Sequence, residues 1–131
     1  MKQIAFASLC VVLVTGLGAC SKHKCDLSSG SDKETFGDVA PMTHGAFSCY
    51  VSNGELVASH GSTTVDKVTD KYKAFLEKDG WSVTVEDKHG ERANGNPYDG
   101  KVIKAEKGGK KALTIVYPLA GDLIETDTAV K

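Results

Sequence analysis

The chain has 131 residues, and its 16 Lys and Arg against 17 Asp and Glu leave a formal net charge of −1. Hydrophobic residues make up 40% and charged residues 25% of the sequence, as is typical of soluble globular domains. This length favours a single domain. The charge balance argues against a nucleic-acid-binding protein, which would carry a clear excess of Lys and Arg.

The first residues have the pattern of a secretory signal peptide. Lys2 supplies a positive charge, and a mostly apolar run from Ile4 to Leu17 follows it. A charge, about a dozen apolar residues and a small-residue cleavage site define this pattern. A membrane-spanning helix needs roughly 20 apolar residues, so we expect segment 1–19 to be removed.

The cleavage site is more specific. Leu17, Gly18, Ala19 and Cys20 resemble the lipobox of bacterial lipoproteins, although Gly18 stands where Ala or Ser is commoner. The resemblance implies that the Cys20 sulfur carries diacylglycerol, that the chain is cut before Cys20, and that the new amino group is acylated, with palmitate a typical chain. The alternative is an ordinary signal peptide cut after Ala19 or slightly earlier, with Cys20 a free thiol.

This resemblance covers residues 1–20 only and implies a cellular location, not an activity. Two or three acyl chains would hold the protein firmly at a membrane. Ser21 follows the lipid-bearing cysteine, where Asp would be a retention signal in many Gram-negative bacteria. We therefore expect a lipid-anchored protein of the cell outer membrane, facing the periplasm or the exterior, rather than one of the inner membrane.

Two cysteines remain in the mature chain, since Cys10 lies in the signal peptide. Cys25 and Cys49 would meet in an oxidising compartment, so we predict a disulfide bond between them. Its loop of about 25 residues corresponds to roughly 3.5 kcal/mol on the chain-entropy model. Free thiols are the first alternative. A metal site with His23 and His44 is the second, but no Cys-x-x-Cys spacing supports it.

The disulfide would also determine how close the domain lies to the membrane. From Cys20 to Cys25 an extended chain spans only about 17 Å. Without the bond, the Ser-, Gly- and charge-rich stretch 26–38 would lengthen the connection. We assign residues 20–40 to the lipidated cysteine and its tether.

Residues 41–118 are predicted to form the folded domain. Alternation over 46–59 around Asn53-Gly54 predicts a β-hairpin. A 3.6-residue apolar stripe over 64–79 predicts a helix, with Thr63 as N-cap and Gly80 after its end.

Three further strands are predicted at 81–86, 101–106 and 112–117, with a long loop at 87–100. Residues 119–131 are expected to be a C-terminal tail with at most a short edge strand at Leu123 and Ile124. The prediction is an α+β fold, β-β-α-β-β-β, in which one helix covers a small antiparallel sheet. A disulfide suits such a small core.

No motif in the sequence predicts a catalytic or metal centre. The histidines His23, His44, His60 and His89 lack metal-ligand spacing. Ser62 follows His60 closely, but no Gly-x-Ser-x-Gly motif accompanies it. We therefore expect a non-enzymatic protein without a cofactor other than the lipid on Cys20.

The predicted loop 87–100 exceeds usual hairpin lengths, and such loops are often binding elements. Its acids and asparagines lack the spacing of an EF-hand calcium site. Its one aromatic residue, Tyr98, is our first candidate for partner binding.

The last hairpin carries five lysines. Such residues commonly guard an exposed strand, and the alternative is a patch that binds anionic lipid headgroups or an acidic partner. The candidate binding residues of this patch are Lys107, Lys110 and Lys111.

The leading functional expectation is a membrane-anchored envelope lipoprotein that acts as a non-catalytic binding or accessory module. We expect a protein partner in the envelope and no nucleic acid. The alternative is a small periplasmic enzyme or ligand carrier with a site between helix 64–79 and loop 87–100. A deep pocket with His60 or His89 beside carboxylates would favour that alternative.

Overall fold

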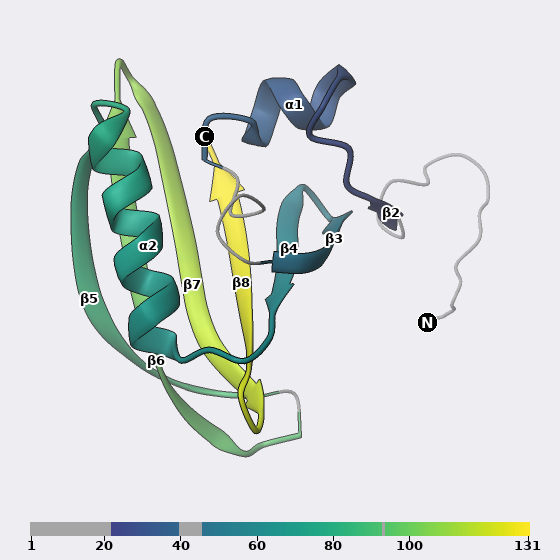
Figure 1. Ribbon diagram of the computed structural model, residues 1–131, viewed down its shortest axis with the longest axis vertical. Coiled ribbons are helices and arrows are strands. Elements are labelled where there is room, and N and C mark those ends of the chain that lie inside the picture. The colour runs from purple at the N-terminus through teal and green to yellow at the C-terminus, as the bar shows by residue number, and fades with distance from the viewer. Residues whose placement is uncertain (1–21, 40–45, 93) are drawn as a thin grey trace.

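The computed structural model describes residues 22–39, 46–92 and 94–131. These residues form one seven-stranded antiparallel sheet and two helices (Figure 1), which confirms an α+β fold built mainly on an antiparallel sheet. The elements in chain order are β2 (Lys22–Lys24), α1 (Gly30–Phe36), β3 (Ala46–Ser52), β4 (Glu55–His60), α2 (Val65–Lys78), β5 (Ser82–Glu91), β6 (Pro97–Lys107), β7 (Lys110–Ala120) and β8 (Leu123–Val130).

The strand order across the sheet is β2-β3-β4-β8-β7-β6-β5. The strands from β5 to β8 follow one another as hairpins, and β8 then pairs with β4 on its other side. Helix α2 lies across the half of the sheet that contains β5, β6 and β7 (Figure 1). The predicted order β-β-α-β-β-β corresponds to β3, β4, α2, β5, β6 and β7, and it lacks β2 and α1 before them and β8 after them. Helix α2 covers only part of the sheet.

Helix α2 begins one residue later than the sequence pattern predicted. The N-cap is Thr64, not Thr63, and its hydroxyl oxygen accepts a hydrogen bond from the Lys67 backbone N–H at 3.2 Å. Both threonines can cap a helix, so the sequence pattern alone did not distinguish between these adjacent residues.

The predicted apolar stripe and helix end are confirmed. Val68, Tyr72 and Leu76 are buried. Gly80 adopts a left-handed φ of +89°, and the Trp81 backbone N–H donates back to the Leu76 carbonyl at 3.0 Å. This is the glycine-terminated Schellman motif, and it turns the chain directly into β5.

Most of the predicted loop 87–100 is strand. β5 and β6 pair without a break from Ser82 opposite Glu106 to Glu91 opposite Pro97. The glycines that suggested a loop accommodate close neighbours instead. A Cβ on Gly90 would lie 2.7 Å from the Tyr98 ring, and one on Gly100 would lie 2.2 Å from the Val116 carbonyl oxygen.

The C-terminal segment is a central strand, not a tail. β8 pairs with β4 on one side and β7 on the other, and Ile124, Thr126 and Thr128 are buried in it. Its inward positions are largely threonines, and carboxylates alternate with them. Weak apolar periodicity therefore led to the wrong prediction of a tail over residues 119–131.

The predicted tether also contains regular structure. β2 pairs with β3, and α1 brings Phe36 into the core, where Val39 joins it at 1% exposure. The stretch is polar apart from a few anchoring side chains, so its order comes from tertiary contacts and not from local propensity.

A polar network crosses the core beneath α2. The Tyr72 hydroxyl lies 3.4 Å from the Thr128 hydroxyl, which lies 2.8 Å from that of Thr114. His60 is 1% exposed, and its Nε2 lies 3.2 Å from the Thr126 hydroxyl. Burial raises the pKa of Tyr72 well above its usual range. Hydroxyl pairs thus satisfy polar groups in an otherwise apolar interior.

Candidate functional site

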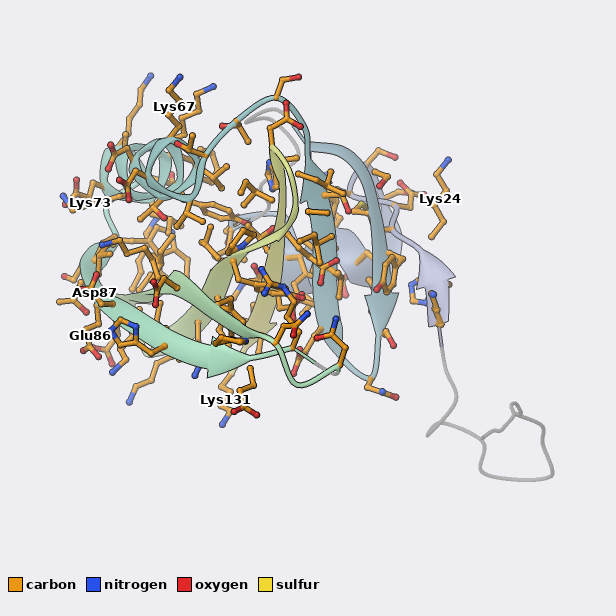
Figure 2. The ribbon with its side chains drawn as sticks, turned by 90° about the horizontal axis from the view of Figure 1, so that it is seen from below. Lys24, Lys67, Lys73, Glu86, Asp87 and Lys131 are labelled. Atoms are coloured by element: carbon orange, nitrogen blue, oxygen red, sulfur yellow. A yellow bond between two sulfur atoms is a disulfide. The ribbon has the colours of Figure 1, made fainter. Side chains whose placement is uncertain are left out.

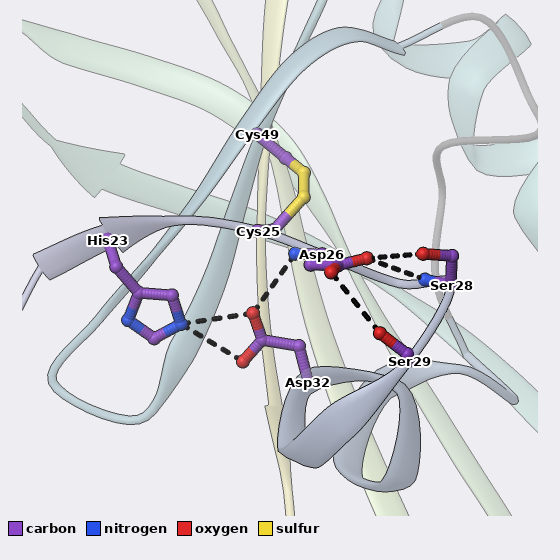
Figure 3. A network of polar contacts seen from close by, with 7 residues as sticks. All are labelled: His23, Cys25, Asp26, Ser28, Ser29, Asp32 and Cys49. Atoms are coloured by element: carbon purple, nitrogen blue, oxygen red, sulfur yellow. Dashed lines mark hydrogen bonds and ion pairs between the residues drawn. A yellow bond between two sulfur atoms is a disulfide. The ribbon is translucent and has the colours of Figure 1, made fainter.

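The first candidate feature fastens the start of the described chain to the sheet. Cys25 and Cys49 form the predicted disulfide, with their Cα atoms 5.6 Å apart and a sequence separation of 24 (Figure 3). The Cys25 backbone N–H also donates to the Cys49 carbonyl at 3.4 Å. The disulfide therefore continues the pairing of β2 with β3.

Hydrogen bonds join the same segment to α1. The Nε2 of His23 lies 3.0 and 3.1 Å from the two carboxylate oxygens of Asp32, which is 8% exposed. The Asp26 backbone N–H donates to the same carboxylate at 3.1 Å (Figure 3). We call His23, Cys25, Asp26, Asp32 and Cys49 the N-terminal clasp.

Asp26 closes the turn that leads into α1. Its carboxylate accepts hydrogen bonds from the Ser28 hydroxyl at 2.6 Å and the Ser28 backbone N–H at 3.0 Å. These bonds hold the pKa of Asp26 below its usual value. Because both ends of this turn are fixed, residues 22–39 are part of the domain and not a flexible connection.

The residues predicted to anchor the protein, Cys20 and the signal segment 1–19, lie outside the described residues. His44, a ligand of the alternative metal site, also lies outside them. Within the described ranges, no helix has the length and apolar character needed to cross a membrane.

The histidines do not converge in the described part of the chain. His60 is enclosed in the core, whereas Ser62 is exposed. His89 lies on the β5–β6 hairpin with its Nδ1 2.6 Å from a carboxylate oxygen of Asp99, and these side chains are 80% and 87% exposed. No group of three or more potential metal-ligating His, Cys, Asp or Glu side chains occurs among the described residues.

The proposed alternative site, between helix 64–79 and segment 87–100, coincides with a hollow of about 430 Å³. Asp66, Asp87, His89, Asp99 and Lys101 are among its lining residues. The Lys101 ammonium donates to Asp87 at 2.5 Å, which lowers the pKa of Asp87 and raises that of Lys101. This hollow places His89 beside carboxylates, but on an open surface that does not exclude water.

Tyr98 is not at the tip of a loop. It lies within β6, half-buried, with its ring centroid 5.1 Å from that of Tyr117 on β7. The Arg92 guanidinium carbon lies 5.8 Å from the Tyr98 ring. Arg92 also donates to the Pro118 carbonyl at 2.7 Å. Tyr98 therefore contributes to a sheet surface, and not to a mobile binding loop.

The three candidate lysines each have an acidic or carbonyl neighbour. The Lys107 ammonium donates to the Asp79 backbone carbonyl at 2.6 Å. Lys110 lies 3.7 Å from the Asp38 carboxylate and Lys111 3.7 Å from that of Glu106. Such exposed pairs contribute little stability, but they reduce the local excess of positive charge.

A second candidate feature was not found from sequence. Because side chains alternate across a strand, the residues of β7 and β8 next to the buried threonines face away from α2. We call this side of the sheet the open face. It includes Glu55 and Val57 on β4, Tyr50 on β3, Leu113, Ile115 and Tyr117 on β7, and Glu125 and Asp127 on β8.

The centre of the open face is acidic and aromatic. The Tyr117 hydroxyl donates to the Glu125 carboxylate and lies 3.5 Å from that of Asp127. Partial burial, together with Glu125 and Glu55, raises the pKa of Asp127 from 3.8 to about 6. Burial and the neighbouring carboxylates also raise the pKa values of Tyr50 and Tyr117.

The open face is hollowed on either side of this centre. A hollow of about 500 Å³ is bounded by Tyr98, Ile115, Tyr117 and Asp127, among other residues. Another of about 630 Å³ includes Leu113. Its side chain is 39% exposed, more than any other large hydrophobic side chain among the described residues. The sequence signal for this face is weak, because Glu125 and Asp127 alternate with polar threonines and not with apolar residues.

No protein-family model matches the chain, and neither curated proteins nor solved structures gave a match.

Proposed function

We propose that this protein is a lipid-anchored, non-catalytic binding module of the bacterial cell envelope, held with its β2 edge against the membrane. The lipobox-like residues before Cys20 supply the anchor in this proposal. The observation that carries it is the N-terminal clasp, because β2 starts at Lys22 and is fixed by the Cys25–Cys49 disulfide.

The clasp leaves little chain between the anchor and the domain. Two peptide units separate Cys20 from Lys22, so an extended chain spans only about 7 Å. This is shorter than the span of about 17 Å estimated from Cys25 alone. A lipid on Cys20 would place the sheet edge formed by β2 at the bilayer surface and direct β5, at the other edge, away from it (Figures 1 and 2).

A binding role is supported by the exposed surfaces rather than by a reactive centre. The hollow that contains His89 is open, and its titratable side chains are largely hydrated. The open face, in contrast, combines partly buried carboxylates, tyrosine rings and apolar side chains. Tyrosine rings are enriched at protein interfaces, whereas carboxylates are depleted at their cores, so a protein partner on this face would have to supply basic groups.

The anchor is tested by the intact mass of the full-length gene product, extracted from a Gram-negative host in detergent. We expect the mass of a chain that starts at Cys20 and carries diacylglycerol and an N-acyl group. The Cys20→Ser variant is expected to lose the lipid. An unmodified cysteine at position 20 in the wild-type protein would overturn the anchored assignment.

The orientation is tested in vesicles that contain phosphatidylcholine brominated near the headgroup end of its acyl chains. In lipidated protein, Lys24→Trp on β2 should add fluorescence that these lipids quench. The matched variant Glu86→Trp on β5 should add fluorescence that they do not quench, with wild-type Trp81 as the baseline. Equal quenching of both variants would contradict an orientation set by the clasp.

A further inference from the structure

The carboxylates at the centre of the open face differ from most other acids of the sheet. Four of the five acids on β5 and β6 lie within 4.0 Å of a basic side chain, in pairs that join Glu86 to Lys104, Asp87 to Lys101, Asp99 to His89 and Glu106 to Lys111. Glu55, Glu125 and Asp127 form no ion pair with any residue in the described ranges.

Asp127 occupies an unfavourable position for a negative charge that has no ion-pair partner in the described ranges. It stands in the central strand β8, between Val57 on β4 and Ile115 on β7. One of its carboxylate oxygens is buried without a hydrogen-bond partner among the described residues. An unpaired, partly desolvated carboxylate lowers stability. Its presence among apolar neighbours is explained if a cation from outside completes the site.

Tyrosine rings stand on both sides of these carboxylates. Tyr117 lies on β7 and contacts Glu125, and Tyr50 lies on β3, across Val57 from Asp127. Rings attract cations through their π faces. The edge of the same surface already shows this contact, because the Lys22 ammonium lies 4.3 Å from the centroid of the Tyr50 ring.

Apolar surface extends beyond the acidic centre in two directions. Ile115 borders the hollow of about 500 Å³, and Leu113 borders the one of about 630 Å³. A small amine would neutralise the carboxylates but leave these side chains uncovered. A polypeptide with basic and apolar side chains would satisfy both.

We propose that the open face binds a basic segment of a partner protein, whose Lys or Arg side chain enters between Tyr50 and Tyr117 against Asp127 and Glu125. Apolar side chains of the same segment pack on Ile115 and Leu113. The inference rests on the proposed binding function and specifies the chemistry of the partner.

Basic side chains line the flanking hollows, with Lys104, Lys111 and Lys131 beside Leu113 and Arg92 beside Ile115. Charge complementarity therefore applies to the centre of the face alone, where Glu55, Glu125 and Asp127 form no ion pair within the described ranges, and the flanking hollows take the apolar side chains of the segment.

The test is fluorescence anisotropy with a fluorescein-labelled peptide that repeats glycine, lysine and leucine, titrated with the full chain in non-ionic detergent. We expect saturable binding. Asp127→Asn should weaken it at least about tenfold, which corresponds to the loss of one close charge pair. This variant should fold, since it removes a charge that burial disfavours, and circular dichroism checks that it does.

Matched controls distinguish binding at this site from nonspecific electrostatic attraction of the basic peptide. Glu86→Gln removes one negative charge from the same side of the sheet at β5 and should change the dissociation constant less than twofold. A peptide with glutamate in place of lysine should not bind. The proposal is overturned by absence of saturable binding, by equal binding to Asp127→Asn, or by equal losses in Asp127→Asn and Glu86→Gln.

Spermidine distinguishes a small amine from a protein segment. It should displace the peptide only at concentrations far above the dissociation constant of the peptide, and equal affinity would contradict a protein partner. Because these measurements do not depend on the lipid, their failure is distinct from the failure of the anchored assignment. Loss of binding leaves the mass of the Cys20 lipid unchanged, and an unmodified Cys20 leaves peptide binding unchanged.

Discussion

The ring of Tyr98 lies directly against Gly90 across the β5–β6 pair, where a Cβ on the glycine would come within 2.7 Å of ring atoms. The glycine therefore provides space for the aromatic side chain, which also packs against Tyr117. Gly90 and Tyr98 both lie in the segment predicted to be a loop, and together they form a regular part of the sheet.

This relationship predicts a coupled effect of two substitutions. Gly90→Ala should lower the free energy of unfolding by about 1–3 kcal/mol, because the new methyl group displaces the Tyr98 ring. In a Tyr98→Ala background the same substitution should be neutral or stabilising, since alanine suits a strand better than glycine. Urea denaturation of all four proteins measures this coupling. Additive effects would contradict the contact.

The threonine pair beneath α2 gives a second prediction. Thr128→Val removes the hydroxyl that lies 2.8 Å from that of Thr114 and 3.4 Å from that of Tyr72. We expect a loss of about 1–3 kcal/mol in unfolding free energy, because buried hydroxyls lose a partner. The double variant Thr114→Val/Thr128→Val should be less destabilised than the sum of the single variants, as denaturant midpoints will show. A sum that matches the double variant would count against the pair.

The disulfide should stabilise the domain by restricting its unfolded chain. For the loop closed by Cys25 and Cys49, the chain-entropy model gives about 3.5 kcal/mol. Guanidinium unfolding of the Cys25→Ser/Cys49→Ser variant should therefore have a clearly lower midpoint than the oxidised wild type. Reductant should lower the wild-type midpoint and leave that of the variant unchanged. An identical midpoint for the oxidised wild type and the variant would show that the bond adds no stability.

Asp127 predicts a specific dependence of stability on pH. Its pKa is about 6 in the folded protein against a usual value of 3.8, mainly because of burial and secondarily because of Glu125 and Glu55. Between these pH values the folded state holds a proton that the unfolded state has lost. The contribution of Asp127 to stability therefore falls as pH rises through this range.

Asp127→Asn isolates that contribution. The variant and the wild type should unfold at similar urea concentrations near pH 4, and the variant should become the more stable protein by pH 7. Thermal or urea unfolding at closely spaced pH values measures the difference between the two proteins, in which the shared titrations of other groups largely cancel. A difference that stays constant with pH would show that Asp127 titrates at its ordinary value.

The sequence alone determined the features that depend on local patterns. The stripe of Val68, Tyr72 and Leu76 and the left-handed Gly80 defined α2, and Asn53-Gly54 marked the turn between β3 and β4. The count of cysteines outside the expected lipobox segment 1–20 predicted the Cys25–Cys49 disulfide over free thiols or a metal site, and the structure contains that bond.

Only the tertiary structure decided where the central strand lies and what the two faces of the sheet contain. β8 has threonines on its buried side and carboxylates on the other, so its apolar signal is weak until β4, β7 and α2 surround it. The structure of residues 22–39 likewise depends on distant partners, since Cys49 holds Cys25 and the core encloses Phe36. Local propensity cannot encode such contacts, because their stabilising energy arises only when segments far apart in the chain meet.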